Sequence, residues 1–160
     1  MRSDRIDEID AKILNLLQKS GRMRRKAIAE AVGLTVPSVS ERMRKLRERG
    51  VLKGYYAAVD AKRLQFGITA FIRITVAKAN SYRNVIAQVC KSEEVLEMHS
   101  ITGEGTHILK VRTYSAQTLE QLLAHIQSFP GVTGTHTNVV MSSFKETQRV
   151  TVRPTDDLAR

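Results

Sequence analysis

The sequence has a single cysteine, Cys90, so no disulfide can form within the chain. A lone thiol fits a reducing compartment, and we expect Cys90 to be buried beside Val85, Ile86 and Val89 rather than reactive. No apolar stretch approaches the roughly 18 residues that a membrane-spanning helix needs, and the N-terminus lacks the apolar region of a signal peptide. We therefore expect a cytoplasmic protein with no membrane partner.

The usual patterns of enzyme chemistry are also missing. The chain has no nucleophile–base motif and no glycine-rich loop for phosphate. Its four histidines, His99, His107, His125 and His136, lack the close spacing of metal ligands. We expect no enzyme activity, no catalytic residues, no metal site and no cofactor.

Positive charge is what the sequence has in excess. It contains 26 Lys and Arg against 16 Asp and Glu, a formal net charge of +10, with a pI of about 10.1. Residues 1–53 carry 14 basic and 7 acidic side chains, a net +7, and the remaining residues carry a net +3. Such charge attracts nucleic acid or an anionic membrane, and its uneven placement favours a discrete basic module.

The first third of the chain predicts a helix-turn-helix. Apolar spacing predicts helices over residues 7–20, 24–32 and 35–49, with Thr35 as the N-cap of the third and Pro37 in its first turn. Val39, Met43 and Leu46 form one inward stripe of that helix. Three short helices with a glycine-containing turn before the last are typical of a helix-turn-helix. The stretch VLKGYYAAV, residues 51–59, is typical of a strand and suggests a winged variant.

The rest of the chain predicts a ferredoxin-like β-α-β-β-α-β unit, which makes the whole protein α+β. Its helices are expected to start at Ser81 and Ser115 as N-caps, and "PGV" ends the second of them. Two helices cover only one face of such a sheet, so we expect a partner subunit on the other. The predicted domains are a winged helix-turn-helix at 1–53, a linker strand at 54–67, the ferredoxin-like oligomerisation domain at 68–146, to which the resemblance described below adds ligand sensing, and a loose polar tail at 147–160.

The third helix predicts how the chain contacts DNA. A helix fits the major groove, where arginine pairs with guanine O6 and N7, and glutamate accepts from a cytosine amine. Cations at the start of the second helix suit phosphate oxygens. Because Arg42 flanks the buried stripe, both a structural ion pair and a DNA contact remain open for it. The predicted DNA-binding residues are Arg24, Arg25, Lys26, Pro37, Ser38, Ser40, Glu41, Arg42, Arg44, Lys45 and Lys53.

Three segments resemble one known family. IDEIDAKILNLLQKSGR, IAEAVGLTVPSVSERMRKLRERGVLKGY and ITGEGTHILKV are similar to the leucine-responsive/asparagine-responsive (Lrp/AsnC, or feast/famine) transcription regulators, over nearly the whole chain to about residue 146. The resemblance implies a nucleoid-associated, sequence-specific regulator of transcription that binds double-stranded DNA. It also implies homodimers formed through the sheet and the linker, which assemble into octamers or related rings, and a free amino acid bound between dimers.

Carried over by position, the resemblance assigns an effector site to the turn after the second sheet strand and to the last strand. Backbone N–H groups beside glycines can bind a carboxylate, and glutamate and threonine oxygens can accept from an ammonium group. The same turn also fits a plain β-hairpin. The family usually has an Asp-Tyr pair where this chain has Thr106 and His107, so the effector preference is altered or the pocket is vestigial. The predicted effector residues are Ile101, Thr102, Gly103, Glu104, Gly105, Thr106, Thr135 and Thr137.

Two other functions stay open. One is an architectural oligomer that compacts DNA without an effector and with little sequence preference. The other is an amino-acid sensor that does not bind DNA. The sequence names neither the effector nor the operator, and it does not say whether target genes are activated or repressed.

Overall fold

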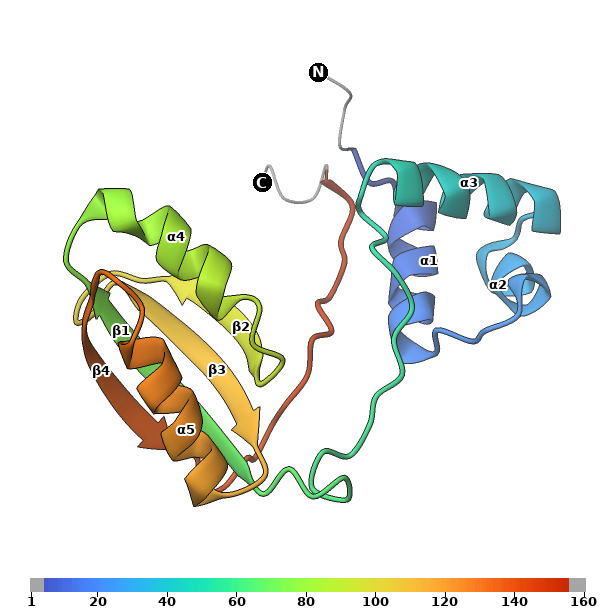
Figure 1. Cartoon of the computed structure of the whole chain (residues 1–160). Coiled ribbons are helices and arrows are strands. Elements are labelled where there is room, and N and C mark those ends of the chain that lie inside the picture. The colour runs from blue at the N-terminus through green and yellow to red at the C-terminus, as the bar shows by residue number, and fades with distance from the viewer. Residues whose placement is uncertain (1–4, 156–160) are drawn as a thin grey trace. The chain divides into compact units, whose positions relative to one another are not determined.

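The computed structural model describes residues 5–155 and divides the chain into two compact units. The first unit comprises the chain up to Ala58 together with the segment from Glu146 onward, and the second is Val59–Lys145. Figure 1 shows the helices of the first and the sheet of the second. No helix within the described residues is long and apolar enough to cross a membrane.

The first unit contains the three predicted helices, α1 (Glu8–Lys19), α2 (Arg25–Val32) and α3 (Val36–Glu48). Asp7 caps α1 and Thr35 caps α3, each by accepting a hydrogen bond from a backbone N–H of the first turn. Arg24 occupies the N-cap position of α2 and makes no capping side-chain bond. The three helices share one apolar core, formed by Ile6, Ala11, Ile13, Leu14, Leu17, Ile28, Ala29, Val39, Leu46 and Leu52.

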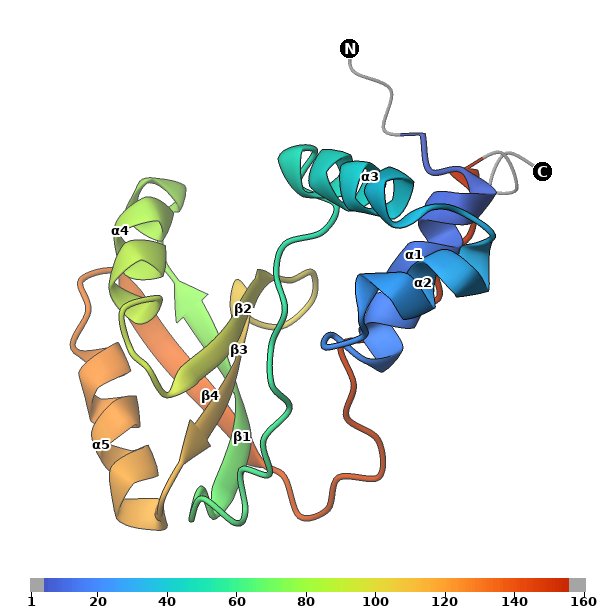
Figure 2. The ribbon, with the colours of Figure 1, turned by 90° about the vertical axis from the view of Figure 1, so that its right-hand side faces the viewer.

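The second unit is a four-stranded antiparallel sheet with two helices, and it confirms the predicted element order. The elements are β1 (Ile68–Val76), α4 (Ala79–Val89), β2 (Val95–Ser100), β3 (His107–Thr113), α5 (Ala116–Gln127) and β4 (Val132–Val139). The strand order is β2-β3-β1-β4, with every neighbouring pair antiparallel. Both helices lie on the same face of the sheet (Figure 2). Alternate residues of β1, from Ala70 to Val76, are buried toward them.

Three expectations about local structure are wrong. Residues 51–67 form no strand, because no strand among residues 5–155 pairs with them, and Tyr55 packs on Gly21 and Arg47 instead. Helix α4 begins before Ser81, with Lys78 at the N-cap position. Cys90 is exposed, because Val85 and Val89 take the buried positions on α4 and Cys90 follows them as the C-cap.

The sequence predicted a loose tail at 147–160, but residues 150–155 are bonded along α1, and residues 156–160 lie outside the described part of the chain. Asn15 donates to the Val152 carbonyl at 2.9 Å and accepts from the Val152 N–H at 3.1 Å. Gln18 makes the same pair of bonds with Val150, each at 2.8 Å. The backbone N–H of Thr155 donates to the Ile6 carbonyl at 3.0 Å, and Val152 packs against the apolar core. Two amide side chains thus bond alternate residues of an extended segment as a neighbouring strand would, and we call residues 150–155 the strap.

Candidate DNA interface and effector site

Helix α3 has one buried side and one polar side. Val39 and Leu46 are fully enclosed, and Met43 packs against the same core. The predicted contact residues on the other side are exposed: Pro37, Ser38, Glu41, Arg44 and Lys45. The hydroxyl of Ser38 lies 2.9 Å from that of the capping residue Thr35, so it also takes part in starting the helix. The polar side of α3 therefore has the composition that direct readout of a major groove requires.

The other predicted DNA contacts lie outside the polar side of α3. Arg24, Arg25 and Lys26 are exposed at the start of α2, and Lys53 is exposed after α3. Exposed cations at a helix N-terminus, where backbone N–H groups also point outward, suit phosphate oxygens. Ser40 is half-buried on α3 and is less accessible than the exposed Ser38 and Glu41.

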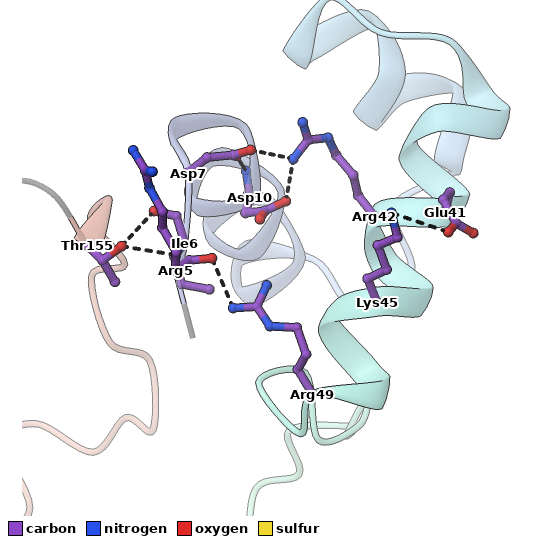
Figure 3. A network of polar contacts seen from close by, with 9 residues as sticks. All are labelled: Arg5, Ile6, Asp7, Asp10, Glu41, Arg42, Lys45, Arg49 and Thr155. Carbon is purple, nitrogen blue, oxygen red and sulfur yellow. Dashed lines mark hydrogen bonds and ion pairs between the residues drawn. The ribbon is translucent and has the colours of Figure 1, made fainter. Parts of the chain in front are cut away.

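Arg42 is tied into the first unit. Its Nη1 atom donates to Asp7 Oδ2 at 2.6 Å and to Asp10 Oδ1 at 2.8 Å, so one guanidinium joins α3 to the first turn of α1 (Figure 3). Asp10 is 7% exposed, and a buried carboxylate needs such a partner. Of the two roles that the sequence leaves open for Arg42, the structure supports the structural ion pair.

The electrostatics of this pair favour the charged forms. Burial opposes ionisation of Asp7, but hydrogen bonds from the Asp10 N–H and from Arg42 outweigh it and lower the pKa of Asp7. Hydrogen bonds to Asp7 and Asp10 raise the pKa of Arg42. The link between α1 and α3 is therefore ionic at neutral pH.

Arg49 is a polar contact that the sequence reading missed. It follows α3 and donates from Nη2 to the carbonyl of Arg5 at 3.0 Å (Figure 3). The neighbouring Ile6 is held by the strap, through Thr155. Arg49 also lines a hollow of about 330 Å³ between α1 and α3, together with Asp10, Ser38, Glu41, Arg42, Lys45 and Leu46. No pattern of neighbouring residues could have indicated these contacts, because the partners are 44 residues apart.

The predicted effector turn joins β2 to β3 and bends back onto β1. Gly103 and Gly105 have backbone φ angles of 90° and 82°, which residues other than glycine rarely adopt. A Cβ atom on Gly105 would also lie 3.1 Å from the Ile74 carbonyl. The carboxylate of Glu104 is exposed and lies 3.4 Å from Arg73 Nη1. The turn thus approaches β1 through its backbone and leaves the Glu104 carboxylate exposed beside Arg73.

The hydroxyl of Thr106 makes all its hydrogen bonds to groups within the chain. It donates to the Ile74 carbonyl at 3.1 Å, accepts from the Val76 N–H at 3.2 Å, and lies 2.9 Å from His107 Nδ1. A hydroxyl has one proton and two lone pairs, so His107 must be the donor in the last contact. We therefore expect Thr106 to position the turn rather than to bind an effector directly.

His107, which donates to the Thr106 hydroxyl, is itself buried. It is 1% exposed, its ring meets the ring of Tyr82 edge-on, and its Nε2 atom has no hydrogen-bond partner among the described residues. Because Nδ1 carries the proton, Nε2 is a bare acceptor. Burial lowers the pKa of His107, so the ring is neutral at physiological pH.

The two predicted residues of β4 lie on the helix-covered face of the sheet. Thr135 is paired with Ile74 and Thr137 with Ile72, both of which are buried toward the helices. Gln127 of α5 donates to the Thr135 hydroxyl at 2.7 Å. Thr135 therefore lies beside Ile74, whose carbonyl Thr106 contacts from the turn before β3, whereas Thr137 lies two residues further along β4, beside Ile72.

Comparison with known proteins identifies the family. Residues 6–53 match a model described as a winged helix-turn-helix DNA-binding domain, and residues 69–150 match the Lrp/AsnC ligand binding domain. The chain belongs to the Lrp/AsnC family of DNA-binding transcriptional regulators. The HTH-type transcriptional regulator FL11 of Pyrococcus horikoshii is 38% identical over 148 residues, which span 92% of this chain and 97% of that protein.

Other Lrp/AsnC regulators agree in sequence and in fold. The leucine-responsive regulatory protein of Escherichia coli K12 is 32% identical over 151 residues, which cover 92% of each chain. A feast or famine regulatory protein of M. tuberculosis, solved in complex with L-methionine, has a TM-score of 0.85 at 30% identity, covering 92% of this chain and 99% of that one. A regulator from Neisseria meningitidis, also solved with L-Met, has a TM-score of 0.84 at 28% identity over 95% and 98% of the two chains.

The role of Arg42 can be tested by removing its guanidinium while keeping its apolar stem. We expect Arg42→Met to lower the free energy of unfolding by about 2 kcal/mol, because the Asp10 carboxylate stays buried without its cation. Urea unfolding of the full-length protein, followed by circular dichroism, measures this change. The matched variant Arg44→Met, at an exposed position of the same helix, should unfold close to wild type. Similar losses in the two variants would contradict the structural role of Arg42.

The buried His107 predicts a pH dependence of stability. In the unfolded chain a histidine titrates near pH 6.5, whereas burial lowers the pKa of His107 in the fold. The unfolded state therefore binds the proton more readily, and the folded state loses stability as the pH falls below about 6.5. We expect the melting temperature to drop less between pH 7 and pH 5 in His107→Phe than in wild type. A drop in melting temperature as large in His107→Phe as in wild type would contradict this role of His107.

Proposed function

We propose that this regulator recognises a specific DNA sequence with the polar side of α3. The observation that carries the proposal is the grouping of Glu41, Arg44 and Lys45 on the exposed side of a helix whose other side is locked in the core. Arg44 would pair with guanine, Glu41 would face the bases beside it, and Arg24, Arg25, Lys26 and Lys53 would contact phosphates. The proposed place of action is the nucleoid, in the cytoplasm.

A second part of the proposal is assembly through the sheet. The face of the sheet away from α4 and α5 carries Phe71, Ile108, Arg73 and Lys110, a mixture of apolar and basic side chains. A sheet face with apolar residues is normally covered by another layer, and a second copy of the chain would cover it in a two-fold dimer. Two copies of α3 would then enter successive major grooves, about 34 Å apart or a multiple of that spacing. An octamer or related ring would be built from such dimers.

A third part of the proposal is control by a free amino acid. The relatives solved with L-methionine support this part. The backbone of the turn around Gly103 would bind the carboxylate, and Glu104 and Thr135 would accept from the ammonium group. The Thr106 hydroxyl already bonds to the backbone of β1. Thr106 would therefore not contact the effector, and fewer side chains would hold it than the sequence predicts. An effector can shift the protein between two states only by its difference in affinity for them.

Sequence preference separates a specific regulator from an architectural protein. We expect the full-length protein to bind a duplex selected from a random pool roughly 10³-fold more tightly than a shuffled duplex of the same composition. Fluorescence anisotropy at fixed salt measures both dissociation constants. A ratio near one would favour DNA compaction without readout, and no binding to either duplex would leave a sensor that does not use DNA.

The effector site is tested by thermal unfolding with each of the twenty amino acids. A ligand at about 100 times its dissociation constant adds roughly 2.7 kcal/mol, which raises the melting temperature by several degrees. We expect a selective rise with one chemical class, lost in Thr135→Val and kept in Thr133→Val, an exposed position on the same strand. The absence of any rise with wild type would mean that the pocket is vestigial and that the regulator acts without an amino acid.

A further inference from the structure

Arg44, the residue proposed to read guanine, is held between two carboxylates of its own helix. Its Nε and Nη2 atoms donate to Glu41 at 2.8 and 2.6 Å, and its Nη1 atom donates to Glu48. Glu41 lies three residues before Arg44 and Glu48 four residues after it, so all three share one strip of the helix surface. We call this arrangement the Glu41–Arg44–Glu48 clamp.

Glu41 is the centre of a wider network. Lys45 Nζ lies 3.6 Å from the same carboxylate, so one acid holds both cations that are proposed to face the bases. The hydrogen bonds from Arg44 lower the pKa of Glu41 to about 2, so the carboxylate is charged at neutral pH. An isolated exposed ion pair contributes little, but a bidentate arginine within a network keeps a defined geometry.

The clamp determines what Arg44 can still bind. A guanidinium has five N–H donors, and the clamp uses three of them, one on each nitrogen. One N–H then remains on each Nη atom, and two donors at the tip of the side chain are what guanine O6 and N7 require. A phosphate is itself an anion and would be repelled by the two carboxylates. The clamp thus leaves Arg44 able to read a base while weakening its attraction to the DNA backbone.

We propose that Glu41 is a specificity-determining residue, which positions Arg44 for guanine and suppresses binding to non-specific DNA. The inference rests on the proposed use of α3 for DNA recognition. Its effect would lie in the ratio between specific and non-specific affinity rather than in affinity alone. Glu48 supports the same side chain from the following turn and should act in the same direction.

The test compares Glu41→Gln with wild type on a duplex selected from a random pool and on a shuffled duplex. Freed from the carboxylate, Arg44 should neutralise one further phosphate, so the slope of log K against log salt should steepen by about 1 on the shuffled duplex. We expect non-specific binding to tighten several-fold and the specificity ratio to fall roughly tenfold. The matched control is Glu30→Gln, which removes the same charge from an exposed position of α2 and should leave the ratio unchanged.

A double-variant cycle distinguishes positioning from a direct contact. In an Arg44→Ala background, Glu41→Gln should change the ratio much less than in wild type, because only the longer contact with Lys45 is then released. If Glu41→Gln lowers the ratio equally with and without Arg44, Glu41 contacts a base itself and the clamp is overturned. If Glu41→Gln behaves like Glu30→Gln, only net charge matters and the inference is also overturned. An Arg44→Ala variant that keeps the wild-type ratio would instead overturn the proposed use of α3.

Discussion

The ion pair between Arg42 and the two aspartates at the start of α1 is the contact on which the presentation of α3 depends. Asp7 caps α1, Asp10 lies in its first turn, and a single guanidinium from α3 bonds to both. A second link runs from Arg49 to the backbone of Arg5, beside the residue that the strap holds. Arg42 and Arg49 are bonded to the start of α1 and to the chain just before it, whereas the proposed DNA contacts Arg44 and Lys45 stay exposed and pair with acids of α3 itself.

The strap gives the first unit a covalent connection to the last strand of the sheet. Residues 140–149 join β4 to the strap, while residues 49–67 join α3 to β1, so two separate chain segments connect the units. Thr135 and Thr137, the proposed effector contacts of β4, lie on the element that leads into the strap.

The sequence predicted the elements but not the contacts that join distant segments. The caps at Thr35 and Ser115 and the apolar stripe of α3 depend on neighbours within a few residues, and each was predicted correctly. The partners of Arg42 lie 35 and 32 residues away, and those of the strap more than 130, so no local pattern indicates them. Residues 51–59 have the composition of a strand, but a strand also needs a neighbour, which a single chain does not supply here. His107 could be placed in the turn motif, yet its burial follows from Tyr82 and Thr106 in the fold.

Methylation interference on a selected duplex tests most directly whether Arg44 reads guanine. Methylation at guanine N7 removes the acceptor that an arginine uses in the major groove. The account predicts that methylation of particular guanines, spaced by about one helical turn or a multiple of it, blocks the wild-type protein. It also predicts that the same methylation no longer reduces the residual binding of Arg44→Ala. Interference at the same guanines in both proteins, or at none in wild type, would contradict the assignment of Arg44 as the base-reading residue.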